Sequence, residues 1–177
     1  MRLTTTRLLL REFEGSDLSR PFPPGLSGAS PAVQTFDFRD PDGVRKQIRF
    51  ALEAAKEEPR HVIDVAVVLR ETDQLIGRAG LQRSATEPRE ALTWFITDPS
   101  IWNQGYLTEG AAAVLGYCFE QLKLHRVWAE CDPKNTGAVR AMEKLGMRRE
   151  AHFVENVWRD GWHDTAVYAL LDREWKP

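Results

Sequence analysis

The chain has 177 residues, of which 42% are hydrophobic and 28% are charged, and its formal net charge at pH 7 is -2. A chain of this length and composition is expected to form one domain, residues 1–177, with a full hydrophobic core. The nearly balanced charge, without any block of like charge, argues against nucleic acid or an acidic membrane surface as the main partner.

Cysteine, histidine and apolar residues exclude further classes of protein. The two cysteines, Cys118 and Cys131, give no disulfide framework, and the four histidines show no metal-ligand spacing with them, so we expect no metal site. No apolar run reaches transmembrane length, and the first six residues lack the apolar core of a signal peptide. We therefore expect a cytoplasmic protein.

The first third of the sequence indicates a strand, a loop and a helix. The leucine-rich segment 7–13 favours a first strand. Five prolines between residues 20 and 41 rule out a long helix, and we interpret this segment as a loop that folds over a site. Asp40 followed by Pro41 is a typical helix start, and an apolar stripe continues the helix up to Pro59.

Three further strands are predicted before the middle of the chain. β-Branched and apolar residues favour strands at 62–69 and 75–81, which a polar turn joins into a hairpin. Another strand, 91–96, ends just before Asp98 and Pro99.

The stretch Ile101–Gly110 follows directly on that strand and predicts a tight glycine turn that leads into a helix. Apolar residues recur at helical spacing from about Thr108 to Leu122, so one face of this helix should be buried. The free N–H groups and the positive dipole end of the helix would face a bound anion, and Gly105 would let the backbone come close to it. A single glycine before a helix is also typical of an ordinary connection, and both interpretations stay open here.

The last third of the sequence favours a strand, a short helix and a hairpin. A strand at 126–131 precedes a helix at 136–145, for which Asn135 is a natural N-cap and Gly146 a natural stop. The closing hairpin has two strands, 154–158 and 162–171, around Arg159, Asp160 and Gly161. Together these elements predict a mixed α/β domain with an antiparallel meander, two strands each followed by a helix, and a closing hairpin.

Two linked motifs carry a family resemblance. The segment Trp102–Gly110 is similar to the pattern W-G-x-G-Y-A-T-E-A, and Asp132–Ala138 with Glu143–Met147 is similar to D-P-x-N-x-x-S followed by E-K-L-G-F. The sequence therefore resembles the GNAT acyltransferase superfamily, and within it the branch that acetylates the N-terminal alanine of ribosomal proteins. The resemblance implies a mostly antiparallel sheet of about seven strands with about four helices, splayed between the fourth and fifth strands.

The resemblance also implies a site for acetyl coenzyme A as cosubstrate. Backbone amides of the turn and the helix start would bind the pyrophosphate: Gln104, Gly105, Tyr106, Leu107, Thr108 and Glu109. The backbone of the fourth strand would pair with the pantetheine arm at Trp94, Phe95 and Ile96, and Asn135 would reach the arm from the other side.

The implied reaction is direct acetyl transfer to a primary amine, either a protein N-terminus or a small amine, with no covalent enzyme intermediate. Glu90 and Asp98 flank the fourth strand and are candidate bases, although a solvated carboxylate is the default interpretation of either. The alternative is a non-catalytic acyl-CoA-binding domain with the same fold. The sequence leaves open whether the protein forms a homodimer.

The sequence departs from the family pattern at four positions. Asn103 stands where the family often has its first glycine, Leu107 where it has alanine or glycine, and Gly110 where it has alanine. Ala138 replaces a serine, which leaves the departing thiolate without an obvious proton donor, although solvent can protonate it. Cys131 is interpreted as a small buried residue rather than a nucleophile, because no histidine or lysine follows at a spacing that would lower its pKa.

Overall fold

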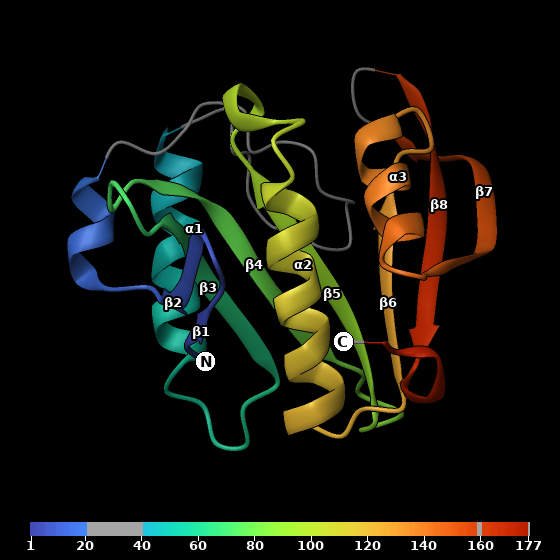
Figure 1. Cartoon of the computed structure of the whole chain (residues 1–177), viewed down its shortest axis with the longest axis horizontal. Helices are drawn as coiled ribbons and strands as arrows, with labels where there is room; N and C mark the ends of the chain where they lie inside the picture. The colour runs from blue at the N-terminus through green and yellow to red at the C-terminus, as the bar shows by residue number, and fades with distance from the viewer. Residues whose placement is uncertain (21–40, 159–160, 177) are drawn as a thin grey trace.

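The computed structural model describes residues 1–20, 41–158 and 161–176. Its strands form one eight-stranded sheet in the order β1-β2-β3-β4-β5-β6-β8-β7 (Figure 1). The strands are β1 (Leu3–Thr4), β2 (Leu8–Glu12), β3 (Val62–Leu69), β4 (Leu75–Arg83), β5 (Glu90–Thr97), β6 (Arg126–Cys131), β7 (Arg148–Trp158) and β8 (Trp162–Leu171). Of the neighbouring pairs, β5 and β6 run parallel and the others antiparallel, which confirms the predicted mixed, mostly antiparallel sheet.

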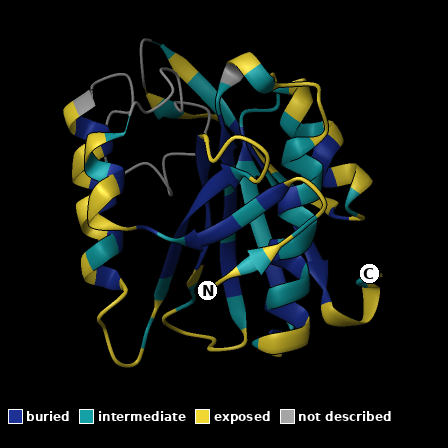
Figure 2. Cartoon of the chain, turned by 60° about the vertical axis from the view of Figure 1, so that its left-hand side comes forward, coloured by how far each residue is buried: buried dark blue, intermediate teal, exposed yellow. Residues whose placement is uncertain are grey.

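Helices cover both faces of this sheet. The α-helices of the described residues are α1 (Pro41–Ala54), α2 (Tyr106–Gly116) and α3 (Thr136–Lys144). Helix α1 packs on one face, and α2 and α3 pack on the other, so the strands between them are buried on both sides (Figure 2). In β3, Val65 and Val67 join the core under α2, whereas Ala66 and Val68 join the core under α1. This double burial explains why β3 is a continuous apolar run with one interruption, Asp64.

The sheet splits between β5 and β6. Their three registered pairs are Glu90 with Arg126, Ala91 with Val127 and Leu92 with Trp128, and the two strands are not paired beyond them. This is the splay that was predicted between the fourth and fifth strands, which are β5 and β6 in the structure. It leaves the backbone of the last five residues of β5 unpaired on the side of β6.

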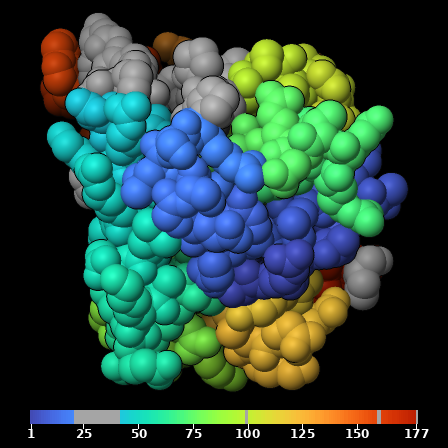
Figure 3. Space-filling view, turned by 90° about the vertical axis from the view of Figure 1, so that its left-hand side faces the viewer, coloured from blue at the N-terminus to red at the C-terminus, as the bar shows by residue number. Residues whose placement is uncertain are grey.

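The N-terminal segment lies against the rest of the sheet and closes its other end. Strand β2 pairs with both β1 and β3, and Arg20 forms an ion pair with Asp73 in the turn between β3 and β4 at 2.8 Å. Figure 3 shows these N-terminal residues in blue between α1 and that turn. The two-residue β1 is the strand that the sequence did not predict.

Some boundaries differ from the predictions. The prediction that the first hairpin strand starts at residue 154 is wrong, because β7 begins at Arg148. β7 is an edge strand whose residues are mostly exposed, so its first half lacks the apolar alternation that reveals a strand. The predicted helix to Leu122 is α2 followed by a π-helical turn, Tyr117–Gln121. The predicted loop at 20–41 and the hairpin residues Arg159 and Asp160 lie outside the described residues, apart from Arg20 and Pro41.

No helix within the described ranges has both the length and the apolar character needed to cross a membrane.

Candidate functional site

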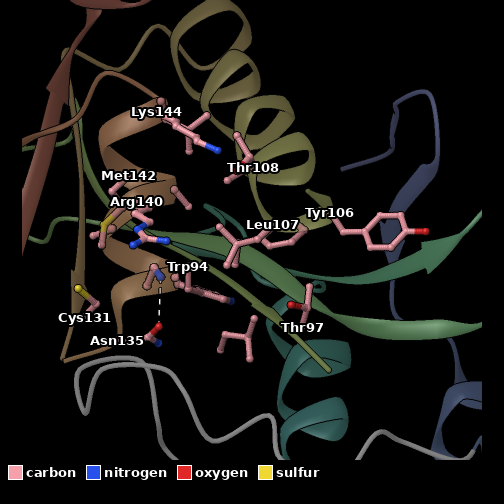
Figure 4. A pocket seen from close by; sticks show the side chains of 18 of the residues that line it. Trp94, Thr97, Tyr106, Leu107, Thr108, Cys131, Asn135, Arg140, Met142 and Lys144 are labelled. Carbon is pink, nitrogen blue, oxygen red and sulfur yellow. Dashed lines mark hydrogen bonds between the residues drawn. The ribbon is translucent and has the colours of Figure 1, made fainter. Parts of the chain in front are cut away.

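A cavity of about 390 Å³ opens where β5 leaves β6 (Figure 4). Strands β5 and β6 form its floor, and helices α2 and α3 form its walls. Its lining includes Thr93, Trp94, Phe95, Ile96 and Thr97 from β5, Gly105, Tyr106, Leu107 and Thr108 from α2, Glu130 and Cys131 from β6, and Asn135, Arg140 and Lys144 at α3. This volume is within the usual range for small-molecule sites.

The turn before α2 is shaped by two left-handed residues. Gly105 has a φ of 82° and Asn103 a φ of 63°, and asparagine is among the few residues other than glycine that adopt this conformation readily. Gly105 is also the N-cap of α2 and provides no side-chain cap, so no cap side chain covers the first N–H groups of the helix. The turn therefore presents backbone amides toward the cavity, as an anion site requires.

The N-terminal segment tethers this turn. Glu109 accepts hydrogen bonds from the Thr5 hydroxyl at 2.6 Å and from the Arg7 backbone and Nε at 2.8 and 2.6 Å. Arg7 also donates to the Gln104 carbonyl at 2.9 Å and lies over the Tyr106 ring at 4.2 Å. Burial opposes the ionised form of Glu109, but these hydrogen bonds hold its pKa below the usual value. The carboxylate of the first helical turn is thus directed away from the amides of the turn.

Helix α3 contributes two cations to the cavity. Arg140 and Lys144 are four residues apart and project from one face of α3 toward α2 (Figure 4). Neither forms a hydrogen bond or an ion pair with any residue that the structure describes. Two positive charges, with no carboxylate partner among the described residues, therefore share the cavity with the amides at the start of α2.

One carboxylate faces the cavity from β6. Val127 and Cys131 point into the core under α2, so the alternation of the strand turns Glu130 toward the α1 side. Glu130 is half-buried and lines the cavity. Among the charged lining residues of the described chain, the two cations and this carboxylate therefore come from different elements, α3 and β6.

The two carboxylates named from the sequence lie elsewhere. Glu90 is at the opposite end of β5, where it bonds to Arg126, which also pairs with Glu150 at 2.5 Å. Asp98 accepts a hydrogen bond from the Ser100 backbone at 2.8 Å and so shapes the turn after β5. Neither is among the described residues that line the cavity, and the side chains of Gln104 and Glu109 also stay outside it.

Asn135 and Cys131 both line the cavity but have different surroundings. The Asn135 side chain accepts a hydrogen bond from the Ala138 backbone at 3.1 Å, which confirms the predicted cap, and it also lines the cavity. Burial, together with the neighbouring Asp132 carboxylate, raises the pKa of the Cys131 thiol to about 11. The thiol therefore stays protonated at neutral pH, as expected for a small buried residue.

The glycine at position 110 has a steric cause. A Cβ atom on Gly110 would overlap the ring of Phe95, which packs from β5 against this turn of α2. The Phe95 ring on β5 can therefore pack at this place only because residue 110 on α2 is a glycine.

Sequence reasoning missed the three charged lining residues, Glu130, Arg140 and Lys144. The alternation of β6 could have revealed Glu130, because Val127 and Cys131 are the apolar partners of its opposite face. The two cations are exposed on α3, and only the packing of α3 against α2 reveals that they face a cavity.

The acetyltransferase (GNAT) domain model matches residues 7–148. The chain belongs to the GNAT acetyltransferase family. The uncharacterized N-acetyltransferase YnaD of Bacillus subtilis (strain 168) is 33% identical over 176 residues, which cover 99% of each chain. These matches confirm the family resemblance and show that the protein is an acetyltransferase.

Solved GNAT structures share the fold. An acetyltransferase (GNAT family) from Bacillus anthracis has a TM-score of 0.76 at 29% identity, covering 98% of this chain and all of that one. The ribosomal-protein-S5-alanine acetyltransferase from Vibrio fischeri has a TM-score of 0.76 at 17% identity, with both chains fully covered. At 17% identity the second likeness concerns the fold alone. GNAT enzymes use acetyl coenzyme A, and within the described residues no group of three or more His, Cys, Asp or Glu side chains could hold a metal ion.

Proposed function

We propose that this protein transfers the acetyl group of acetyl coenzyme A directly to a primary amine within a ternary complex. The observation that carries the proposal is the pair Arg140 and Lys144, which faces the start of α2 across the cavity and has no carboxylate partner among the described residues. Cations on α3 and free amides at the start of α2 together suit the phosphates of a coenzyme, and Glu130 on β6 suits an ammonium group.

The coenzyme would lie along the split in the sheet. Its pyrophosphate would bind the amides of residues 104–109, with Arg140 and Lys144 supplying positive charge. Its pantetheine arm would hydrogen-bond the backbone of residues 94–96, which has no partner among the described strands on that side. Asn135 would contact the arm from α3, in addition to its role as a cap.

The chemistry requires a proton acceptor and correct alignment of the reactants. A protonated amine must lose a proton before or during attack, and a carboxylate in the cavity is suited to accept it directly or through water. Glu90 and Asp98 remain candidates for this role, but the geometry favours Glu130, because it alone of the three lines the cavity. Solvent can protonate the departing thiolate, since a thiol has a pKa of about 8.5.

Two acceptor classes fit this reaction, a protein N-terminus and a small amine. The test is release of free thiol when the protein is mixed with acetyl coenzyme A and a panel of N-terminal peptides, polyamines and amino sugars. We expect release with one acceptor class. Coenzyme binding by calorimetry without thiol release from any amine would instead support the alternative, a non-catalytic acyl-CoA-binding domain. A cytoplasmic location, a single domain and a homodimer stay predictions, and sedimentation can test the last.

A further inference from the structure

Three residues form a row across the α1 face of the sheet. Asp64 in β3 is in register with Gly80 in β4, and Gly80 is in register with Trp94 in β5. Trp94 lines the cavity, and its indole Nε1 donates a hydrogen bond to Asp64 Oδ1 at 3.2 Å. The indole therefore spans two strands, away from β6.

Gly80 makes room for this position of the ring. A Cβ atom at Gly80 would lie 2.6 Å from the Trp94 ring, closer than real side chains approach. Figure 4 shows the indole nitrogen of Trp94 pointing away from Cys131, which belongs to β6. The missing side chain in β4 and the hydrogen bond in β3 thus hold the ring in the same place.

The polar group that holds the ring is itself deeply buried. Asp64 and Arg78 are each 1% exposed, with Arg78 Nε 3.3 Å from Asp64 Oδ1. Gln47 of α1 donates to Asp64 Oδ2 at 2.6 Å, and the Arg78 guanidinium lies 5.4 Å from the centre of the Trp94 ring. Burial raises the pKa of Asp64 and lowers that of Arg78. Apolar residues of similar volume often replace such a pair with no loss of stability, so stability alone does not explain this cluster.

The orientation of Trp94 matters because of where β5 and β6 separate. Their last registered pair is Leu92 with Trp128, and Trp94 is the next residue of β5 on the same face. A tryptophan ring at this position that turned toward β6 would lie across the gap between the two strands. In the structure the ring is turned toward β3 instead.

We propose that Asp64 is a positioning residue, which holds the indole of Trp94 over β4 and thereby keeps the α1 side of the gap open for the acceptor amine. The inference rests on the proposed acetyl transfer, in which coenzyme and amine meet in this gap. Asp64 should therefore affect the binding of the amine and not that of the coenzyme, because the coenzyme phosphates would bind at α2 and α3.

A matched pair of substitutions separates the effect of the Asp64–Trp94 hydrogen bond from the effect of the buried charge of Asp64. Asp64→Asn removes the charge but keeps an oxygen for the indole N–H, and the Asn amide can donate to Gln47 Oε1, which has no hydrogen-bond partner in the described chain. Asp64→Leu removes both charge and acceptor. We expect the KM for the amine to stay within about twofold of wild type in D64N and to rise about tenfold or more in D64L, with coenzyme affinity unchanged in both.

Trp94→Phe tests the same contact from the other side and serves if D64L does not fold. It should raise the KM for the amine as D64L does. The double variant D64L/W94F should have the same KM for the amine as W94F, because each single substitution removes the same hydrogen bond. The control is Trp175→Phe, which also removes an indole hydrogen bond to a carboxylate, Glu120 at 3.1 Å, but does not line the cavity. W175F should leave the KM for the amine unchanged.

Indole N–H signals in ¹H–¹⁵N spectra report on the Asp64–Trp94 hydrogen bond in a measurement that does not depend on enzyme activity. The Trp94 signal, assigned by its loss in W94F, should persist at its position in D64N and move in D64L. An unchanged amine KM in W94F, or equal values in D64N and D64L, would overturn the inference while leaving the acetyl transfer intact. Absence of thiol release by the wild-type protein with every amine would instead refute the proposed function.

Discussion

On the α2 side of the split sheet, Arg140 and Lys144 face the cavity without a partner among the described residues, whereas on the α1 side Asp64 and Arg78 are buried against each other. The first pair can gain by binding a ligand, because no residue in the described part of the chain bonds to its charges. The second pair is buried, and Asp64 already accepts hydrogen bonds from Gln47 and Trp94, so it is suited to orient its neighbours. Charged residues around one cavity can therefore serve two different purposes.

The largest expected effect concerns the carboxylate between these two sides. Glu130→Gln should lower kcat/KM by about 100- to 10,000-fold, since this is the usual contribution of a positioned general base. Steady-state rates with saturating acetyl coenzyme A measure it, with a coenzyme titration to show that binding is retained. Glu90→Gln and Asp98→Asn are the matched controls. A loss in either that exceeds the loss in Glu130→Gln would assign the base to Glu90 or Asp98 instead.

The second largest expected effect tests whether the cations on the α2 side of the sheet bind a phosphate of the coenzyme. Replacement of both Arg140 and Lys144 by alanine should weaken acetyl coenzyme A binding by about 10- to 100-fold. This is about the contribution of one hydrogen bond to a charged group, about 1.5–3 kcal/mol, because both cations are exposed and solvent screens each of them. Titration calorimetry at low and high salt measures this loss. The exposed Lys46 of α1, replaced by alanine, is the control for charge alone.

A series of shortened cosubstrates shows which phosphate is involved. If the two cations bind the 3′-phosphate, the effect of the double substitution disappears with 3′-dephospho-acetyl-CoA. If they bind the pyrophosphate, it persists there and disappears only with acetylpantetheine. An equal loss with acetylpantetheine would mean that the cations support the fold of α3 and not the ligand.

The smallest effect concerns the tether between the N-terminal segment and α2. The lowered pKa of Glu109 means that its hydrogen bonds to Thr5 and Arg7 stabilise the fold above the usual carboxyl pKa of 4.5, and that this stability is lost as pH falls through the lower folded value. Glu109→Gln should cost about 1 kcal/mol or less at pH 7, because Arg7 is partly exposed. Urea unfolding from pH 3 to 7 measures it. A difference from wild type that stays constant over this range would contradict the pairing.

The sequence predicted the elements whose pattern is local. The strands predicted at 62–69 and 126–131 coincide with β3 and β6, and Asn135 caps α3 as expected. The start of β7 was missed because an exposed edge strand has no apolar period. Cosubstrate contacts were predicted through motifs, and Trp94 and Gly105 do line the cavity.

Contacts between distant segments could not be predicted in the same way. Asp64 interrupts an apolar strand, which is a visible signal, but its bond to Trp94 depends on the register of three strands. The direction of Arg140 and Lys144 depends on how α3 packs against α2. Glu109 bonds to Arg7 across 102 residues of sequence, a distance over which no local pattern is informative.

The order of strands in the sheet has a consequence for folding during synthesis. Strands β1 to β5 are neighbours in the sheet in the order in which they are translated, so each can pair with its predecessor as it leaves the ribosome. Strand β6 must wait for the whole of α2 before it can join β5 in parallel, and β8 must be made before β7 has a partner. The cavity lies at this junction. A nascent chain can therefore bury much of its core well before it can bind a cosubstrate, and binding competence should be the last property that it acquires.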